Sequence, residues 1–331
     1  MGKINMRLSI IVNMYNTAKY LPKCMDTLLN QDISSSDYEI ILVDDCSTDN
    51  SLELAEEYVV RYSNVRICRH ELNRGLAAAR NTGIDAARGK YLSFVDPDDY
   101  IEKNSFDSLL KQMDSQQLDM LRFRYQKIDE YGNIVPDYES EVHFDYSSSV
   151  MTGTDFLATR LDIGCYVWAY IYRLDFLRQS GIRFFEGCFF DDTPWLPRVL
   201  QKAQRVGVTN TRHQYYLQRR GSMVHSHNIE AVLRKVNTQM QLIDILKEQK
   251  QSAPPETYEW YDMMLAHATI SLLTSVAVHD YSLSIKYYKQ LCLKGLQKLK
   301  YDRASNKSKT KIVMFNTFPK TLLFFIHIKN K

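Results

Sequence analysis

The nine residues YLSFVDPDD, Tyr91–Asp99, place a mostly apolar run directly before a turn rich in aspartate. A short apolar run bounded by turn residues predicts a buried β-strand. After the strand, residues two apart in extended backbone point the same way, so Asp96 and Asp98 can face one target. Pro97 keeps the segment from continuing as a helix. Such carboxylates suit Mg²⁺ or Mn²⁺ held together with substrate phosphates, although an acidic turn capping the next helix would have the same composition.

The chain before this stretch alternates strand and helix signals. Apolar runs predict the strands, and apolar positions at helical spacing predict the helices. We expect strands at Leu8–Met14, Tyr38–Val43 and Val65–Cys68, and helices at Thr17–Gln31, from Asp49 to about Tyr62, and at Gly75–Ala87, which Gly89 ends. This alternation predicts an α/β fold with a mostly parallel sheet flanked by helices.

Polar residues follow the first two strands as well. Tyr15 and Asn16 come after the first strand, and Asp44 and Asp45 end the second. Ligands of parallel sheets bind at the carboxyl ends of the strands, so these residues converge with the acidic turn on one site. Tyr15 can stack on a base, and the carboxylates can accept from a uracil N3–H or a ribose hydroxyl. Wall packing and helix capping are the alternative interpretations.

The stretch from Asn73 to Gly83 lies between the third strand and the acidic strand. It places Arg80 in the helix that precedes the acidic strand. Arg80 can meet a phosphate, or it can form a salt bridge to one of the aspartates.

The pattern after the acidic turn is less regular. A helix is expected at Asn104–Gln116, a strand at Leu118–Tyr125, a polar crossover at Asp129–Ser149, and short helices at Thr154–Leu161, Leu174–Gln179 and Thr193–Lys202. From Asn228 onward the pattern is helical. We therefore expect one domain at residues 1–225, which carries the strand-end site, and a helical C-terminal region at 226–331.

Composition and missing motifs exclude several functions. The net charge of +3 and the lack of a basic, aromatic stripe through the body of the chain argue against nucleic-acid binding. The six cysteines form no C-x-x-C pair, which fits a reducing cytosol, and no apolar run is expected to span a bilayer. The loop after the first strand lacks the glycines of a nicotinamide dehydrogenase or nucleotidyltransferase, a P-loop is absent, and a receiver domain would be much shorter.

The four N-terminal stretches, in this order and spacing, resemble the inverting glycosyltransferase family 2, whose members have the GT-A fold. The resemblance is close over about the first hundred residues and looser to about residue 225. It implies that Tyr15 stacks on the base, Asp45 pairs with uracil, and Asp96 and Asp98 bind Mn²⁺ or Mg²⁺, with Asp98 the direct ligand. Pro97 replaces a small residue of the family pattern, as Cys46 does, without removing a ligand.

The stretch Phe184–Asp192 resembles the family's acidic motif on the acceptor side. Its position implies that Asp192 is the general base, since an inverting transfer needs one base opposite the leaving group. Asp191 stands where the family usually has Glu, which leaves open which carboxylate points inward. Capping of the helix that starts near Thr193 is the alternative role for Asp192.

The same resemblance implies further contacts with donor and acceptor. Gly164–Arg173 resembles the segment before the base, and Tyr216–Ser222 a stretch that closes over the diphosphate. The implied contacts are Asn73 and Arg219 for the nucleotide and Trp168, Glu186 and Trp195 for the acceptor, while His225 and His227 are weaker candidates for metal or phosphate.

The last fifty residues are basic and end in a Phe-rich apolar run, Phe315–Ile328. Such a tail can lie on an anionic membrane surface, or it can form a helix packed on the body. The two interpretations stay open.

Together these residues predict an inverting, metal-dependent glycosyltransferase of the hexosyltransferase type. The expected donor is a UDP-sugar, with GDP and dTDP open, and the acceptor a glycan or lipid-linked glycan of surface polysaccharide synthesis. The expected location is the cytoplasm, with peripheral contact at the inner membrane face. The alternative is a catalytically degenerate module that binds a nucleotide or a glycan.

Overall fold

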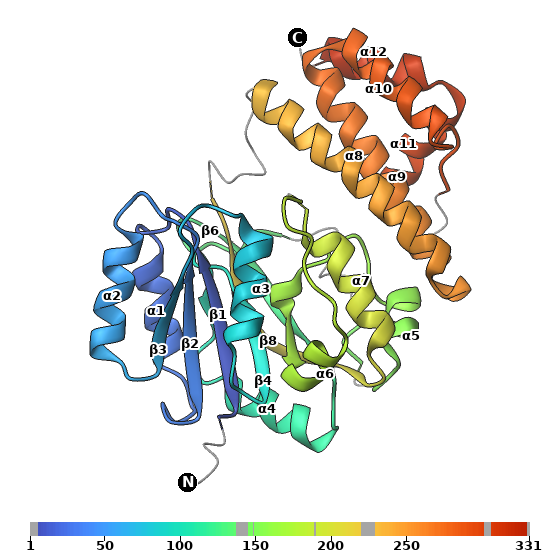
Figure 1. Ribbon diagram of the computed structural model, residues 1–331. Coiled ribbons are helices and arrows are strands. Elements are labelled where there is room, and N and C mark those ends of the chain that lie inside the picture. The colour runs from blue at the N-terminus through green and yellow to red at the C-terminus, as the bar shows by residue number, and fades with distance from the viewer. Residues whose placement is uncertain are drawn as a thin grey trace. The chain divides into compact units, whose positions relative to one another are not determined.

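The computed structural model describes residues 6–136, 145–147, 149–188, 190–219, 229–300 and 306–329 (Figure 1). The chain forms two compact units. The sheet unit comprises Met1–Phe156, Cys165–Gly187 and Asp191–Arg219, and the helical unit comprises Leu157–Gly164, Cys188–Phe190 and Arg220–Lys331. The domain boundary expected at residue 225 lies outside the described residues.

The first half of the sheet is parallel, as the sequence predicts. Its strands are β1 (Leu8–Met14), β2 (Tyr38–Asp44), β3 (Val65–Arg69) and β4 (Tyr91–Val95), in the order β3-β2-β1-β4. Every residue of β1, β2 and β4 is buried, which explains why these strands read as continuous apolar runs. In register, Met14 lies beside Asp44, and Val12 beside Val95. The polar residues after these strands therefore share one edge of the sheet.

The second half of the sheet is mixed and was largely missed by the sequence analysis. Its strands are β5 (Tyr100–Ile101), β6 (Met120–Asp129), β7 (Tyr170–Arg173) and β8 (Val206–Gln218), which extend the order to β4-β7-β6-β8-β5. Only β6 was expected. β7 pairs antiparallel with β4 and β6, whereas β8 runs parallel to β6. The predicted α/β class, a sheet flanked by helices with a helical C-terminal region, is confirmed.

Helices of the sheet unit lie close to their predicted positions. They are α1 (Leu21–Leu29), α2 (Ser51–Arg61), α3 (Leu76–Ala86), α4 (Phe106–Ser115), α5 (Gly153–Thr159), the 3-10 turn η1 (Val167–Ala169), α6 (Leu174–Gln179) and α7 (Asp192–Lys202). In α1 the buried residues recur at i, i+3, i+4 and i+7, which is the spacing of one helical face. The buried residues of α3 include three consecutive alanines, Ala77–Ala79, and Gly83, whose small side chains let the helix approach β1 and β2 closely.

The helical unit contains α8 (Ile229–Ser252), the 3-10 turn η3 (Pro255–Thr257), α9 (Tyr258–His279), α10 (Tyr281–Leu293), α11 (Asn306–Thr317) and α12 (Pro319–Lys329). Helix α9 is its centre and packs against α8, α10, α11 and α12. Among the described residues, Pro255–His279 alone is long and apolar enough to cross a membrane, contrary to the expectation that no run would be, but it is largely buried. We interpret α9 as the core helix of this unit.

The prediction that Gly89 ends α3 is wrong, because the helix already stops at Ala86. Its role is close packing against β1. A Cβ atom at Gly89 would lie 2.5 Å from the backbone carbonyl carbon of Leu8 and from the backbone nitrogen of Ser9. The Gly89 N–H also donates to Ser9 Oγ at 2.8 Å. This contact sets the start of β4 beside the start of β1.

Gly89→Ala is expected to lower the free energy of unfolding by about 1–3 kcal/mol, because backbone atoms cannot move aside for the added methyl group. Urea denaturation followed by circular dichroism would measure the change. Arg88→Ala is the matched control, since the Arg88 side chain is exposed and its backbone N–H is kept. Equal stability of the two variants would contradict this account of Gly89.

Candidate active site

The three aspartates of the acidic turn after β4 differ in burial, because their side chains point in different directions. Asp99 is fully buried and accepts hydrogen bonds from Gln214 Nε2 at 2.7 Å and from the Leu217 backbone N–H at 2.9 Å. It therefore fastens the turn to β8. Burial raises the pKa of Asp99 well above its usual range, and the charges of Asp96 and Asp98 add to the rise. The side chains of Asp96 and Asp98 keep 26% and 21% of their surface exposed, so these two can meet a ligand.

Asp98 is paired with Arg219, which follows β8. Arg219 Nε donates to Asp98 Oδ2 at 2.6 Å, and the guanidinium lies over the ring of Tyr20 at 4.9 Å from its centroid. The structure therefore brings together the predicted metal ligand and the residue predicted to contact the diphosphate. A positive charge already faces Asp98 at the place where a cation was expected.

Arg80 is the centre of a buried cluster of charges. Its side chain, on α3, is only 2% exposed. Nη1 donates to Asp191 Oδ2 at 2.8 Å and also to Asp192 Oδ1, while Nη2 lies 3.9 Å from Asp96 Oδ1. Arg80 thus forms the salt bridges that the sequence analysis gave as its alternative role. It links the acidic turn to the start of α7.

Asp191 and Asp192 differ in access to solvent. The Asp191 side chain is 5% exposed, whereas that of Asp192 is 23% exposed. Asp192 also accepts a long hydrogen bond of 3.5 Å from the Val167 backbone N–H. The first residue of α7 is Asp192, and its carboxylate faces Arg80 and Val167 instead of capping the helix. Of the two candidates for a general base, Asp192 is the one a substrate could reach.

Burial shifts the ionisation of this cluster toward neutral pH. Desolvation raises the pKa of Asp192 to about 7; Arg80 opposes the rise, and the carboxylates of Asp191 and Asp96 add to it. The pKa of Asp96 is raised to about 6 by burial, again opposed by Arg80 and reinforced by Asp98 and Asp191. A carboxylate with a pKa near 7 is well matched to accept a proton under physiological conditions.

Tyr15 and Asn16 lie at the mouth of the loop after β1. The Tyr15 side chain is 48% exposed, so its ring is free to take a flat ligand. Asn16 adopts a positive φ of 54°, a conformation that asparagine tolerates better than most residues. Its Oδ1 accepts from the Thr48 backbone N–H at 2.8 Å. Asn16 therefore braces the loops after β1 and β2 against each other.

Asp45 is buried and already holds three hydrogen bonds. Its carboxylate meets His70 Nδ1 at 2.6 Å, and accepts from the backbone N–H groups of Arg74 and Gly75 at 2.9 and 2.7 Å. Asn73 Nδ2 donates to the Asp45 backbone carbonyl at 3.2 Å. A carboxylate offers about four acceptor positions, so these contacts leave one unfilled, on a side chain that is 5% exposed.

Asp44 is fully buried. Its Oδ1 accepts from the Ser47 backbone N–H at 3.3 Å. Its Oδ2 has no hydrogen-bond partner among the residues that the structure describes. This side chain supports the loop after β2 and presents no surface to a ligand in this conformation.

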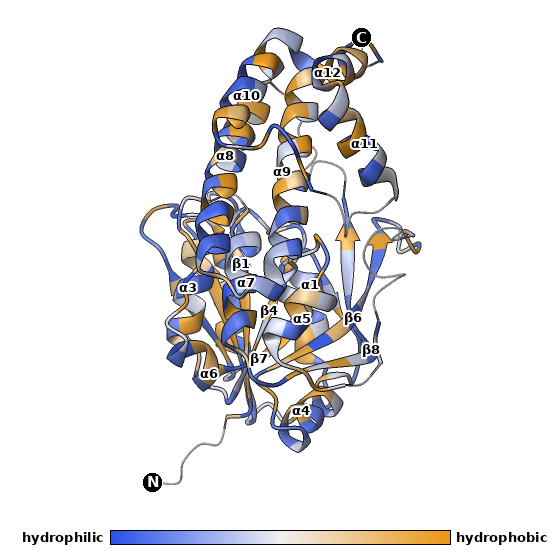
Figure 2. Cartoon of the chain, turned by 90° about the vertical axis from the view of Figure 1, so that its right-hand side faces the viewer, coloured by the Kyte–Doolittle hydropathy of each residue, from blue (hydrophilic) through white to orange (hydrophobic). Residues whose placement is uncertain are grey.

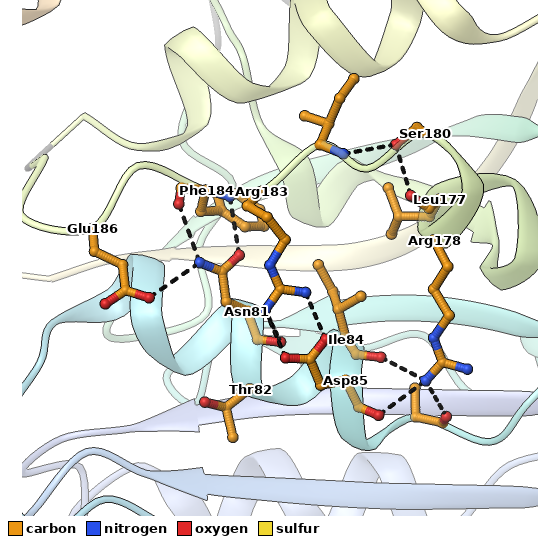
Figure 3. Close-up of polar contacts among 12 residues, drawn as sticks. Asn81, Thr82, Ile84, Asp85, Leu177, Arg178, Ser180, Arg183, Phe184 and Glu186 are labelled. Atoms are coloured by element: carbon orange, nitrogen blue, oxygen red, sulfur yellow. Dashed lines mark hydrogen bonds and ion pairs between the residues drawn. The ribbon is translucent and has the colours of Figure 1, made fainter.

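Glu186 belongs to a polar network between α3 and the segment before α7. Asn81 Nδ2 donates to the Phe184 carbonyl at 3.1 Å and reaches Glu186 Oε1 at 3.5 Å (Figure 3). Arg74 Nη2 donates to Glu186 at 3.0 and 3.2 Å. Arg183 pairs with Asp85 farther along α3 (Figure 3). These contacts hold the segment before α7 against α3, and Glu186 stays exposed at its edge.

The two tryptophans predicted to contact the acceptor are core residues. Trp195 has no exposed surface and stacks on Phe184 with ring centroids 4.2 Å apart, so the prediction for Trp195 is wrong in this conformation. Trp168 is 3% exposed and packs between Tyr166 and Tyr125, each with ring centroids 4.9 Å away. The aromatic spacing that suggested a sugar-binding wall instead builds the interior beneath the site.

The sequence analysis missed His70, Asn81 and Tyr20. His70 joins Asp45 to Thr82 Oγ1, from which its Nε2 lies 2.9 Å. His70 follows β3, so the rule that directs ligands to strand ends could have found it. Asn81 and Tyr20 carried no such signal, because their partners lie far away in the sequence.

No group of three or more His, Cys, Asp and Glu side chains within the described ranges is arranged to hold a metal ion. Asp96 and Asp98 are the two exposed carboxylates of the turn, so a cation there would need substrate oxygens to complete its coordination. His225 and His227 lie outside the described residues.

Comparison with known proteins gives a consistent picture. Residues 9–169 match the model of glycosyl transferase family 2. The chain is 38% identical over 202 residues to the uncharacterized glycosyltransferase EpsJ of Bacillus subtilis, covering 60% of this chain and 57% of that protein. It is 32% identical over 219 residues to the uncharacterized glycosyltransferase YibD of Escherichia coli, covering 64% and 61%. The chain thus spans about three fifths of each relative.

Among solved structures, the fold is similar to that of Staphylococcus aureus TarS, residues 1–349, in complex with UDP-GlcNAc. The TM-score is 0.59 at 22% identity, with 82% of each chain covered. At this identity the likeness establishes the fold.

Arg80→Met is expected to lower the free energy of unfolding by about 3 kcal/mol or more, because it leaves buried carboxylates without their cation. Without Arg80, the pKa values of Asp192 and Asp96 rise further. When the pKa of a carboxyl group is raised in the folded state, the folded protein loses stability as the pH increases through that pKa. The loss of unfolding free energy in Arg80→Met should therefore be larger at pH 8.5 than at pH 6. Urea denaturation at both pH values would measure it.

Arg61→Met is the matched control for this variant. Arg61 forms an exposed ion pair with Glu57, with side chains 65% and 58% exposed, and such pairs contribute little. A deficit of Arg80→Met that shrinks at high pH would contradict the assigned charge cluster.

Proposed function

Because residues 9–169 belong to glycosyl transferase family 2, we propose that this chain is an inverting glycosyltransferase. It moves a hexose-type sugar from a nucleoside diphosphate to a hydroxyl group of a glycan. The observation that carries the proposal is the Arg80 cluster, which places the accessible carboxylate of Asp192 beside the acidic turn at Asp96. The Arg80 guanidinium thereby connects the proposed base with the end of the site where the diphosphate leaves.

The proposed reaction is a direct displacement at the anomeric carbon. The acceptor oxygen forms the new bond to that carbon as the bond to the diphosphate oxygen breaks, and Asp192 takes the hydroxyl proton. One displacement from the face opposite the leaving group inverts the configuration. Arg80 stabilises the ionised form of Asp192, while burial keeps its pKa high enough for the carboxylate to bind a proton.

The proposed donor is a UDP-sugar, with GDP- and dTDP-sugars as alternatives. The exposed ring of Tyr15 can stack on the base, and the one unfilled acceptor position of Asp45 suits the uracil N3–H. The TarS complex with UDP-GlcNAc supports this choice, since it places such a donor on a similar fold. Arg219, next to Asp98, is the basic residue proposed to contact the diphosphate.

A divalent cation, Mn²⁺ or Mg²⁺, is part of the proposal. Asp96 and Asp98 fit it because they offer only oxygen donors, are partly exposed and lie two residues apart after a strand. When bound, the cation would supply positive charge to the departing diphosphate. Arg219 would have to release Asp98 for the carboxylate to serve as its ligand.

The proposed acceptor is a glycan or lipid-linked glycan of surface polysaccharide synthesis. The proposed location is the cytoplasm, at the inner membrane face when the acceptor is lipid-linked. A degenerate binding module, the alternative function, would bind the donor without transferring its sugar.

Asp192→Asn should leave UDP binding intact but lower turnover at least about a hundredfold, because the proton acceptor is lost. The assay is UDP release from UDP-hexoses in the presence of acceptor, with calorimetry for binding. In the unmodified protein, kcat/KM should rise with pH up to about 7, since Asp192 must be ionised. Asp191→Asn is the matched control. If the control alone abolished turnover, the base would be Asp191, and no turnover in the unmodified protein would favour the degenerate module.

Asp98→Ala should weaken metal-dependent UDP binding by about tenfold or more, since one of two carboxylate ligands is removed. Calorimetric titration with UDP in Mn²⁺ and in EDTA would measure it. The control is Asp26→Ala, on the exposed face of α1. Equal affinity of Asp98→Ala and the unmodified protein in Mn²⁺ would remove Asp98 from the proposed metal site.

A further inference from the structure

Helix α12 carries a large apolar surface on its outer face. Phe324, Phe325 and Ile328 are 46%, 60% and 53% exposed. Residues spaced by three and four positions share one side of a helix, so these three form one face together with Thr321. The opposite side of α12 packs into the helical unit, and on the exposed face Phe324 also meets the ring of Tyr281 edge-on, with centroids 5.6 Å apart.

The inner face of α12 is apolar as well. Leu322 and Leu323 are buried, and α12 contacts α9, α10 and α11. Figure 2 shows apolar colour along α12. A surface helix of a water-soluble domain normally presents polar residues on its outer side, whereas a helix that is apolar on both sides has an apolar environment on both. We therefore expect the outer face of α12 to be covered by an apolar partner.

Exposed apolar residues continue before α12. Val313 and Met314 on α11 are 46% and 40% exposed, and Phe318 between the helices is 64% exposed. The inner side of α11 is filled by Ile312 and Phe315, both buried. The exposed residues are thus additional to a complete core.

The charge of this segment has one sign. Asn306–Lys329 contains five lysines and no aspartate or glutamate. Two of them, Lys320 and Lys329, stand near the two ends of the exposed face of α12, and both are exposed. Phenylalanine and isoleucine between lysines are the side chains that insert into the interfacial region of a bilayer while the ammonium groups meet anionic headgroups.

We propose that the outer face of α12 binds peripherally to an anionic lipid bilayer, with Phe324, Phe325 and Ile328 inserted at the headgroup boundary. A second copy of this chain is the competing occupant of an apolar face. Two copies would bring the lysines of Asn306–Lys329 together, and this segment has no acidic residue to pair with them, which the charge pattern disfavours. A membrane supplies both the apolar depth and the opposite charge.

The proposal is independent of the transfer reaction, because vesicle binding and UDP release are measured separately. The experiment is flotation of the full chain with vesicles of phosphatidylcholine alone and of phosphatidylcholine with 30% phosphatidylglycerol. Binding is expected on the anionic vesicles and should fall at 1 M NaCl. Phe325→Ser combined with Ile328→Ser should weaken it by tenfold or more.

Two further variants sharpen the test. Lys320→Gln combined with Lys329→Gln should weaken binding by about fivefold for each lysine. Val60→Ser combined with Leu72→Ser is the matched control, because these residues of the sheet unit are also exposed, at 87% and 62%, and its binding should be unchanged. Thermal melts confirm that each variant is folded.

Three outcomes would overturn the proposal. One is no binding to anionic vesicles, and another is equal loss in the control and the α12 variants. The third is a concentration-dependent dimer, detected by sedimentation, that Phe325→Ser with Ile328→Ser abolishes without changing vesicle binding. That last result would assign the face to a second copy of the chain.

Discussion

The active-site end of this fold depends on one buried cation. Arg80 lies among the carboxylates of Asp96, Asp191 and Asp192, which come from positions up to 112 residues away in the sequence. Without it, three negative charges in a largely dry region would repel one another and lose solvation. With it, the acidic turn after β4, the helix α3 and the start of α7 are joined through one cation that all three carboxylates face. The cation also rests near the ring of Phe184, 5.3 Å from its centroid.

Adjacent aspartates take different roles in this site because they differ in burial. In each of two acidic pairs, one aspartate is buried and the other partly exposed: Asp99 against Asp98, and Asp191 against Asp192. Neighbouring residues in extended backbone point to opposite sides, and in a helix they lie about 100° apart around the axis, so either kind of pair can supply one side chain to the structure and one to the site. The buried member positions the exposed one. The Asp44–Asp45 pair differs, because both of its members are buried.

The sequence predicts β1, β2 and β4 well, because each is buried on both faces and reads as a nearly continuous apolar run. β3, with the sequence VRICR, is only partly buried and was found by its place in the strand–helix alternation. The strand β8 defeats this rule. Its thirteen residues VGVTNTRHQYYLQ include threonine, asparagine, arginine and glutamine. The strand has a partly exposed stretch between its buried residues, and it carries polar groups that bind the acidic turn. The residues of the site were foreseeable where they end strands, as with Asp96 and Asp98. Contacts such as Asn81 with Phe184 depend on tertiary packing that no local pattern encodes.

Trp195 shows why composition alone misassigns a site. A tryptophan three residues after a proposed catalytic carboxylate suggests a sugar-binding surface, since residues three apart share one side of a helix. Asp192 is the first residue of α7, yet Trp195 has no exposed surface and is a core residue. There it stacks on Phe184 and meets Phe94 of β4 edge-on at 6.3 Å. Burial is the main cause of the raised pKa of Asp192. Trp195 belongs to the aromatic core of the sheet unit, three residues after that carboxylate along α7.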